Sequence, residues 1–308
     1  MNKFTEIINE VKKAINGKDK VIADILLAII AGGNILIEDI PGVGKTTLAL
    51  AFSKALSLDC KRVQFTPDTM PSDITGFSIY DKATNKFIFK KGAIFCNLFL
   101  ADELNRTSSR TQAALLEAME ENGVTVDGKT FELEKPFSVI ATQNPTGASG
   151  TQLLPDSQTD RFMIKLKMGY PDNNSEYHML INRANSNPLD SVMPVVTKEE
   201  LLQIQQNVKD VYMSSEIARY IVMLSDATRR SDIIKRGVSP RATIALSDMA
   251  KAMAYACSRD YVVPSDVAAV IKPTFTHRII LSSKATASQI SSEDAVTIIF
   301  NKIKAPRA

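Results

Sequence analysis

The sequence predicts an α/β protein in which a parallel sheet flanked by helices is followed by a small, all-helical domain. Short apolar segments alternate with helical patterns through the first half of the chain, which is typical of parallel strands joined by covering helices. After about residue 171 the strand signal fades, and helical runs continue to the end. We therefore expect one domain over residues 1–171 and a second over residues 172–308.

The first domain begins with the order helix, helix, strand, glycine loop, helix. Residues 4–16 and 19–31 have helical periodicity, and residues 34–37 form a short apolar strand. The loop that follows leads into a helix over residues 46–56. Further elements are expected in this order: a strand at 62–65, a strand within 93–101, a helix at 111–121 and a buried strand at 137–142.

The second domain is expected to consist of helices with clear start signals. Thr197 and Glu200 form a capping box, in which each side chain bonds the other residue's backbone N–H group. Ser239 and Pro240 mark another helix start, since proline is favoured at the first helical position. Helical runs cover about 214–231, 240–259, 265–278 and 291–303.

Composition and charge exclude several classes of protein. The 308 residues are 44% hydrophobic and 23% charged, as in folded globular proteins. The net charge is only +3 and no basic face is concentrated, so no nucleic-acid partner is expected. The most hydrophobic window, residues 21–31, is far shorter than the roughly 20 residues that cross a bilayer. We expect a soluble protein that is not integral to a membrane.

Cysteine and histidine usage points to a reducing cytoplasm and away from metal or triad chemistry. Cys60, Cys96 and Cys257 are far apart and never form C-x-x-C, so neither a disulfide framework nor a zinc site is expected. His178 and His277 are the only histidines, which leaves little basis for a Ser-His-Asp triad. Both are expected to be surface or capping residues.

The stretch E-D-I-P-G-V-G-K-T-T, residues 38–47, resembles a phosphate-binding loop. The pattern G-x-x-x-x-G-K-[ST] is met except that Asp39 replaces its first glycine, so a working site, a relic and a coincidence of glycines are alternatives. In a working site, backbone N–H groups from Gly42 to Thr46 would surround phosphates at a helix start. Lys45 would contact the β- and γ-phosphates of a nucleotide, and the Thr46 hydroxyl would ligate Mg²⁺.

The residue Asp39 needs its own explanation, because a carboxylate aimed at phosphates would repel them. We predict that its side chain turns away and accepts hydrogen bonds from backbone or side-chain groups. The plainer alternative is a solvated loop residue. The following Ile40-Pro41 pair stiffens the loop, because proline fixes its own φ and biases the preceding residue toward an extended shape.

Polar residues follow two further strands, where α/β sheets bind ligands. N-L-F-L-A-D-E ends in Asp102, suited to hold magnesium, and Glu103, suited to polarise the attacking water. The plainer interpretation is a strand that merely ends in acidic residues. V-I-A-T-Q-N-P ends in Gln143 and Asn144, where an amide would orient that water; its alternative is a turn-forming Asn-Pro.

Two arginines complete the candidate set. Arg161 lies near the end of the sheet domain, with a surface salt bridge as its alternative role. Arg241 lies in the first turn of a helix, where the helix dipole disfavours a cation. That placement suggests an anionic ligand, with a packing role as the alternative.

These segments together resemble the MoxR family of AAA+ ATPases, in the branch with an insert in helix 2. The matching stretches run from about residue 35 to 242 and include V-Q-F-T-P-D-T-M-P-S-D-I-T-G, L-A-D-E-L-N-R, Q-A-A-L-L-E-A-M-E-E, L-P-D-S-Q-T-D-R-F and G-V-S-P-R-A. The resemblance implies an AAA+ nucleotide-binding domain followed by a helical lid. It also implies the insert at about 65–92 and a β-hairpin before sensor 1 at about 124–137, for which Asp127-Gly128 is a turn signal.

The resemblance also implies roles by position. Lys45 and Thr46 would belong to the Walker A element, and Asp102 and Glu103 to Walker B. Asn144 would be sensor 1, and Arg241 would be sensor 2. Arg161 would be an arginine finger that acts on a neighbouring subunit. Lys45 also counts among the expected catalytic residues. The expected nucleotide contacts are Gly17, Pro41, Gly42, Val43, Gly44, Lys45, Thr46, Thr47 and Arg241.

A finger that acts in trans implies a homo-oligomeric ring, typically a hexamer, that hydrolyses ATP with Mg²⁺. Such proteins often remodel or activate protein clients, among them proteins with von Willebrand factor A domains. Two alternatives remain: a nucleotide-gated scaffold with little turnover, and a DNA-directed motor, which the weak charge disfavours. A GTPase lacks support, because Asn85-Lys86 is followed by Phe87-Ile88 and not by the guanine-reading N-K-x-D pattern.

Overall fold

The sheet domain of the computed structural model, which describes residues 2–40, 42–144, 153–177 and 187–306, is built on five parallel strands. Their order is β2-β5-β8-β1-β9, and the bounds are β1 (Ile35–Glu38), β2 (Cys60–Gln64), β5 (Leu98–Asp102), β8 (Ser138–Gln143) and β9 (Ile164–Leu166). The prediction of a parallel sheet is confirmed. The strand β9 was missed, because three residues carry too little periodicity to be recognised.

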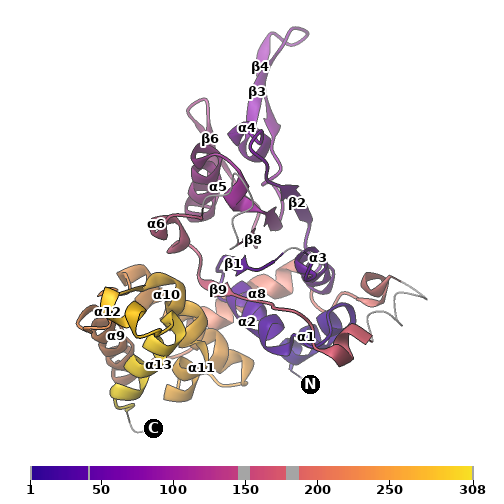
Figure 1. The fold of residues 1–308 in the computed structure, drawn as a ribbon. Coiled ribbons are helices and arrows are strands. Elements are labelled where there is room, and N and C mark those ends of the chain that lie inside the picture. The colour runs from indigo at the N-terminus through magenta and orange to yellow at the C-terminus, as the bar shows by residue number, and fades with distance from the viewer. Residues whose placement is uncertain (1, 41, 145–152, 178–186, 307–308) are drawn as a thin grey trace.

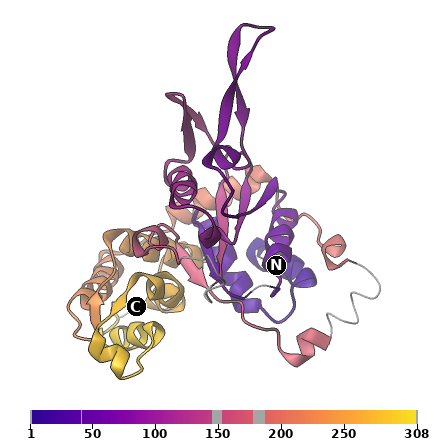
Figure 2. The same cartoon turned by 45° about the horizontal axis from the view of Figure 1, so that its top comes forward.

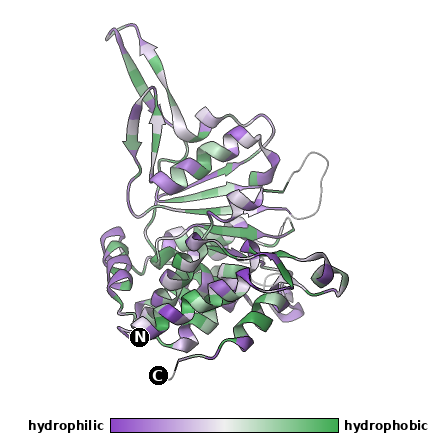
Figure 3. Cartoon of the chain, turned by 90° about the vertical axis from the view of Figure 1, so that its left-hand side faces the viewer, coloured by the Kyte–Doolittle hydropathy of each residue, from purple (hydrophilic) through white to green (hydrophobic). Residues whose placement is uncertain are grey.

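The central strands β1, β5 and β8 are buried on both faces, whereas the edge strand β2 is largely exposed, and the buried strand residues alternate between two cores. Ile35, Leu98 and Ile140 face the core that holds the first three helices, whereas Leu36 and Phe99 face a second core. Period-two alternation of side chains produces this division. The covering helices are α1 (Lys3–Ala14), α2 (Asp19–Ile30), α3 (Lys45–Ala55), α4 (Pro71–Thr75), α5 (Ser109–Glu121) and α6 (Asp156–Thr159), with the short turn η1 (Leu104–Arg106) after β5. Figure 3 shows hydrophobic colour along the central strands.

Two hairpins project away from the sheet domain on its upper side (Figures 1 and 2). One joins β6 (Gly123–Val126) to β7 (Lys129–Glu132), and its turn residues Asp127 and Gly128 both have positive φ, as the turn signal predicts. The other joins β3 (Gly76–Asp81) to β4 (Lys86–Lys91) within the expected insert. The insert was predicted by resemblance, but its hairpin shape was not.

The C-terminal part is helical, as predicted, apart from one small antiparallel pair. Its helices are α8 (Lys198–Asp210), α9 (Ser215–Arg229), α10 (Pro240–Ala256), α11 (Pro264–Phe275), α12 (Ser283–Ala287) and α13 (Ser292–Lys302), with η2 (Pro188–Ser191) and η3 (Thr276–Arg278). The pair β10 (Ile234–Arg236) and β11 (Ile280–Leu281) corrects the all-helical expectation, because strands this short leave no pattern.

The helix α8 belongs to both parts of the molecule. The Gln205 amide donates to the Ile29 carbonyl of α2 at 2.8 Å, and α8 also packs against α10. The domain boundary at residue 172 stays a prediction. Within the described ranges, no helix has the length and apolarity needed to cross a membrane.

Candidate functional site

The glycine loop connects β1 to α3 through two left-handed residues. Gly42 has φ of 86° and Gly44 has φ of 94°, a region that side chains of L-residues rarely adopt. Gly44 is the N-cap of α3, and the helix begins at Lys45. The Thr46 and Thr47 side chains are half-buried in its first turn. The predicted contact Pro41 lies outside the described residues.

A cavity of about 360 Å³ lies beside this loop. Gly42, Val43, Gly44 and Thr47 line one side of it. Asn16 and Lys18, the neighbours of Gly17, line another side. Gly17 itself packs against Ser175, so that a Cβ atom added at Gly17 would lie 2.3 Å from the Ser175 Oγ. The segment that the family resemblance assigns to adenine therefore borders the same cavity as the loop. A larger cavity, of about 670 Å³ between α2, β9 and α11, has no phosphate-binding loop.

The Lys45 ammonium is folded back onto its own loop. Its Nζ donates to the Asp39 carbonyl at 2.7 Å and to the Ile40 carbonyl at 3.2 Å, and the residue is only 8% exposed. Burial lowers the pKa of Lys45, and the carboxylates of Asp102, Asp39 and Glu103 oppose that effect. The cation therefore lies among acids at the point where phosphates are expected.

The Asp39 side chain turns toward the backbone, as predicted. Its Oδ1 accepts from the Ile40 N–H at 2.8 Å, and its Oδ2 accepts from the Gly169 N–H at 2.5 Å. Asp39 is buried, so the plainer alternative of a solvated loop residue is wrong. Because Gly169 lies just after β9, the carboxylate ties the loop to the next strand of the sheet.

The carboxyl end of β5 brings Asp102 and Glu103 beside a threonine of β8. The Thr142 Oγ donates to Asp102 Oδ1 at 2.7 Å and accepts from the Glu103 N–H at 2.9 Å. Asp102 also forms an ion pair with Arg62, whose Nη2 lies 2.7 Å from Asp102 Oδ2. The Glu103 carboxylate forms an ion pair with Arg106, with Oε2 and Nη1 2.7 Å apart. The sequence interpretation missed Thr142, although its one signal was a polar residue inside a buried apolar strand.

Glu103 itself has φ of 57°, in the left-handed region. Such a conformation is uncommon outside glycine and turns the chain sharply from β5 into η1. The side chain thus leaves the sheet at its carboxyl edge, which is where the strand ends of β1 and β8 also lie.

The two amides after β8 have different environments. The Gln143 Nε2 donates to Glu38 at 2.5 Å, and its buried Oε1 has no hydrogen-bond partner in the described part of the chain. Asn144 exchanges two hydrogen bonds with the Asn105 side chain, through its N–H at 3.3 Å and its carbonyl at 3.2 Å. The Gln143 amide is therefore hydrogen-bonded to Glu38 of β1, and the backbone of Asn144 is held at the sheet edge by Asn105.

The two predicted arginines lie together and away from the loop. Arg161 pairs with Glu120 at 2.8 Å, and Arg241 pairs with the other oxygen of the same carboxylate. The described residues that line the cavity beside the loop include neither arginine. Figure 1 shows α6 and α10 on one side and α3 on the other, with β1 and β9 between them. Sequence reasoning missed Glu120, whose role is visible only in the folded chain.

This arrangement defines a P-loop nucleotide-binding protein: a glycine loop opening a helix, with carboxylates and amides at the ends of the adjacent strands. Residues 34–164 match the family model described as the ATPase family associated with various cellular activities (AAA). Residues 226–299 match the model described as the AAA lid domain.

Three similar proteins narrow the class. The chain is 44% identical to the uncharacterized protein YeaC of Bacillus subtilis, over 97% of this chain and 93% of that one. It is 34% identical to Chaperone MoxR1 of Mycobacterium tuberculosis, over 97% of this chain and 81% of that one. A crystal structure of a candidate ATPase from Cytophaga hutchinsonii matches with a TM-score of 0.91 and 39% identity, covering 99% and 95% of the two chains. The chain belongs to the MoxR family of AAA+ ATPases, which confirms the resemblance.

Proposed function

We propose that this protein hydrolyses ATP in a homo-oligomeric ring, a hexamer by family resemblance, and uses the cycle to remodel or activate protein clients. The observation that carries the proposal is the separation, within one chain, of the two arginines from the glycine loop and the carboxylates. The loop, the carboxylates and Asn144 gather at one edge of the sheet, whereas Arg161 and Arg241 lie together elsewhere. Arginines placed this way are available to the ATP site of a second copy.

Within one chain, the loop N–H groups and Lys45 would bind the triphosphate. Phosphate oxygens would replace the Asp39 and Ile40 carbonyls that now accept from Lys45. The cavity beside the loop has room for the base and sugar next to the segment around Gly17. Glu103 would then take a proton from, or orient, the attacking water, with Asn144 as its second polar contact.

The residues expected at Mg²⁺ are suited to it. Thr46 and Asp102 offer a hydroxyl and a carboxylate, and Mg²⁺ usually binds one or two carboxylates, phosphate oxygens and several waters. A cluster of three acidic, histidine or cysteine ligands, which the described ranges lack, is not required for such binding. Bound Mg²⁺ would neutralise charge that develops on the transferred phosphoryl group.

The ion pairs that now occupy these residues leave their arginines accessible to solvent. Arg62 and Arg106 are 43% and 42% exposed, whereas the carboxylates of Asp102 and Glu103 are only 11% and 20% exposed. Glu120 is 28% exposed, and its partners Arg161 and Arg241 are 31% and 49% exposed. A phosphate from a neighbouring subunit would therefore compete for the guanidinium groups of Arg161 and Arg241.

The hairpin of β3 and β4 is the surface best suited to a protein client. Tyr80 is 50% exposed and Phe87 is 74% exposed, and the centroids of their rings lie 5.3 Å apart. Exposed aromatic side chains on a projecting element are typical of protein-binding surfaces. By family resemblance the clients include proteins with von Willebrand factor A domains, and the name of the relative Chaperone MoxR1 is in line with a remodelling role. The free cysteines support a cytoplasmic location.

The test is to trap the ATP-bound state with Glu103→Gln and to measure the mass of the assembly in solution with and without ATP. We expect a closed ring that forms with ATP, hydrolyses at least ~100-fold more slowly than the unmodified protein, and retains its client. Lys45→Ala serves as the control that does not bind the triphosphate. A strictly monomeric protein at saturating ATP would refute the ring, and unchanged turnover in Glu103→Gln would instead favour the scaffold alternative.

A further inference from the structure

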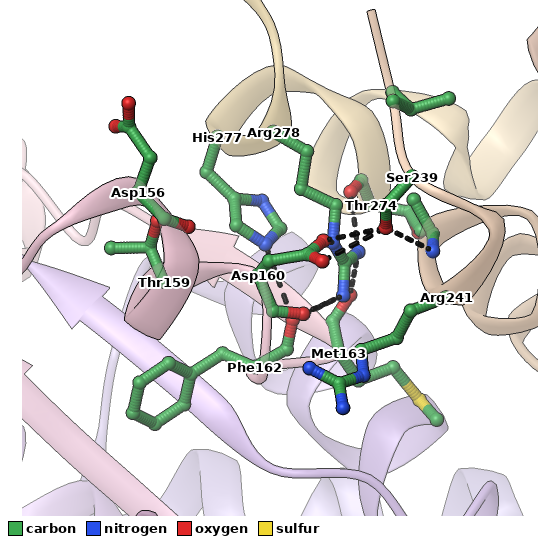
Figure 4. Close-up of polar contacts among 12 residues, drawn as sticks. Asp156, Thr159, Asp160, Phe162, Met163, Ser239, Arg241, Thr274, His277 and Arg278 are labelled. Atoms are coloured by element: carbon green, nitrogen blue, oxygen red, sulfur yellow. Dashed lines mark hydrogen bonds and ion pairs between the residues drawn. The ribbon is translucent and has the colours of Figure 1, made fainter. Parts of the chain in front are cut away.

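One buried arginine of the C-terminal part holds the segment that carries Arg161. This finger segment, residues 159–163, runs from the end of α6 toward β9. Arg278 reaches it from η3, directly after α11, and is only 5% exposed. Figure 4 shows its guanidinium group between the finger segment and the helix from which it comes.

All five N–H donors of Arg278 are used, which is the full capacity of a guanidinium. Its Nη2 donates to the carbonyls of Asp160 at 3.0 Å and Phe162 at 2.6 Å, the residues on either side of Arg161. Its Nε donates to Asp160 Oδ1 at 2.8 Å. Its Nη1 donates to the carbonyls of Met163 at 2.9 Å and Thr274 at 2.7 Å. Burial lowers the pKa of Arg278 to about 10, and the charge of Asp160 opposes that shift.

The same contacts link the finger segment to Arg241. The Asp160 carboxylate accepts from the Ser239 hydroxyl at 2.8 and 3.1 Å, and Ser239 is the N-cap of α10. Arg241 follows two residues later and shares Glu120 with Arg161. The carbonyls and the Asp160 carboxylate of the finger segment are therefore bonded by the C-terminal part, whereas its backbone N–H groups bond within the sheet domain, that of Met163 to the Asn34 carbonyl at 2.8 Å.

We propose that Arg278 is a positioning residue that sets where Arg161 reaches into the ATP site of the neighbouring subunit. The proposal rests on the proposed ring, in which Arg161 acts in trans. Two carbonyls that flank Arg161 are bonded by one planar group, so the position of the finger depends on η3 and α11 as well as on the sheet domain. A lysine in place of Arg278 has three donors in a different geometry and cannot reproduce these contacts.

The test mixes two inactive variants, so that hydrolysis requires one finger-donating and one ATP-hydrolysing subunit. Arg161→Ala keeps its own ATP site but has no finger, and Glu103→Gln keeps its finger but cannot hydrolyse. Equimolar mixed rings should regain activity at the sites of the Arg161→Ala subunits. Failure of this mixture would contradict the ring with a trans finger, and the proposal for Arg278 would fall with it.

Arg278→Lys is then added to one subunit type at a time. When Arg278→Lys is in the finger-donating Glu103→Gln subunit, we expect the kcat of the mixed ring to fall at least tenfold, because small misplacements of catalytic groups lower the rate strongly. The KM for ATP should change by less than about twofold. In the Arg161→Ala subunit we expect kcat within about twofold of the unmodified mixture. Equal effects in both positions, or no effect in either, would overturn the proposal, because a merely structural role does not depend on which subunit carries the change.

A matched control is available within the same domain. Arg259 also makes a bidentate pair with a buried carboxylate, that of Asp266, but it contacts no residue of the finger segment among the described contacts. Arg259→Lys in the finger-donating subunit should leave the regained kcat within about twofold. Should Arg278→Lys melt below the assay temperature, Asp160→Asn in the same two positions provides the second variant, with the same asymmetry expected.

Discussion

Asp39 illustrates how one side chain fits an otherwise ordinary phosphate loop. A glycine is usual at this position, yet the carboxylate here accepts two backbone N–H groups and ties the loop to Gly169. The Lys45 Nζ donates to the Asp39 and Ile40 carbonyls. We therefore propose separate roles for the two charged residues of the loop, Asp39 in loop geometry and Lys45 in ligand binding.

This division predicts unequal effects of two substitutions. Lys45→Ala should lower ATPase activity at least ~100-fold, because it removes the charge that meets the phosphates. Asp39→Ala should lower it less than about tenfold and reduce the free energy of unfolding by ~1–3 kcal/mol, since two backbone donors lose a charged acceptor. Steady-state kinetics and urea unfolding measure both effects. Equal losses of activity would contradict the division.

Thr142 connects Asp102, the last residue of β5, to Glu103, which follows it in the chain. Its hydroxyl donates to Asp102 and accepts from the Glu103 N–H, and the residue is fully buried. Thr142→Val keeps the shape but removes the hydrogen bonds to Asp102 Oδ1 and to the Glu103 N–H group, so we expect ~10–100-fold lower kcat and ~1–3 kcal/mol lower stability. Thr142→Ser, which keeps the hydroxyl, should restore most of the kcat. A Ser variant no better than Val would show that the methyl group, and not the hydroxyl, matters.

At the scale of elements, the hairpin of β3 and β4 combines exposed aromatic residues with positive charge. Phe77, on the opposite face of the hairpin from Tyr80 and Phe87, is 49% exposed. The strands and turn carry Lys82, Lys86, Lys90 and Lys91 against a single acidic residue, Asp81. This chemistry suits a client segment that is apolar and acidic.

The hairpin should therefore be needed for the client but not for hydrolysis. Replacing Tyr80 and Phe87 together by serine should leave basal ATPase activity within about twofold and remove the client from the Glu103→Gln trap. The matched control is the other hairpin, where Thr125→Ser and Thr130→Ser should leave the client bound. Comparison of the trapped proteins by mass spectrometry gives the result. Loss of basal activity in the serine pair would indicate that the hairpin takes part in assembly instead.

At the scale of the whole molecule, the C-terminal part contacts the sheet domain through η3. The His277 Nε2 lies 3.2 Å from the Phe162 carbonyl, next to the contacts of Arg278. Burial lowers the pKa of His277 well below its ordinary value of 6.5, and the charge of Arg278 adds to the effect. The expectation of a surface or capping residue is corrected: His277 lies at the contact between the two parts, whereas His178 lies outside the described residues.

The lowered pKa predicts acid sensitivity. Below pH 6.5 the unfolded chain binds a proton at His277 that the folded chain does not, so stability is present above that pH and is lost as the pH falls. The loss approaches ~1.4 kcal/mol per pH unit for one such group. Urea unfolding at pH 7.5 and 5.5 should show a smaller pH dependence in His277→Gln than in the unmodified protein. Identical pH dependence in the two proteins would contradict the assignment.

The sequence by itself determined the fold class, the family and the local chemistry of the loop. Strand and helix periodicity act over a few residues, and the loop pattern specifies a backbone in which Gly42 and Gly44 adopt positive φ. The turn of the Asp39 carboxylate toward backbone N–H groups was predicted from its charge. Each of these conclusions depends on residues that are adjacent or nearly adjacent in the chain.

Only the tertiary structure decided which distant residues meet. Thr142 lies 40 positions from Asp102, and Arg278 lies 118 positions from Asp160, so no local pattern records these hydrogen bonds. The shared carboxylate of Glu120 and the short strand β9 were missed for the same reason. Folding brings such partners together through the packing of whole elements, and the division of the site between the loop and the two arginines is a property of that packing.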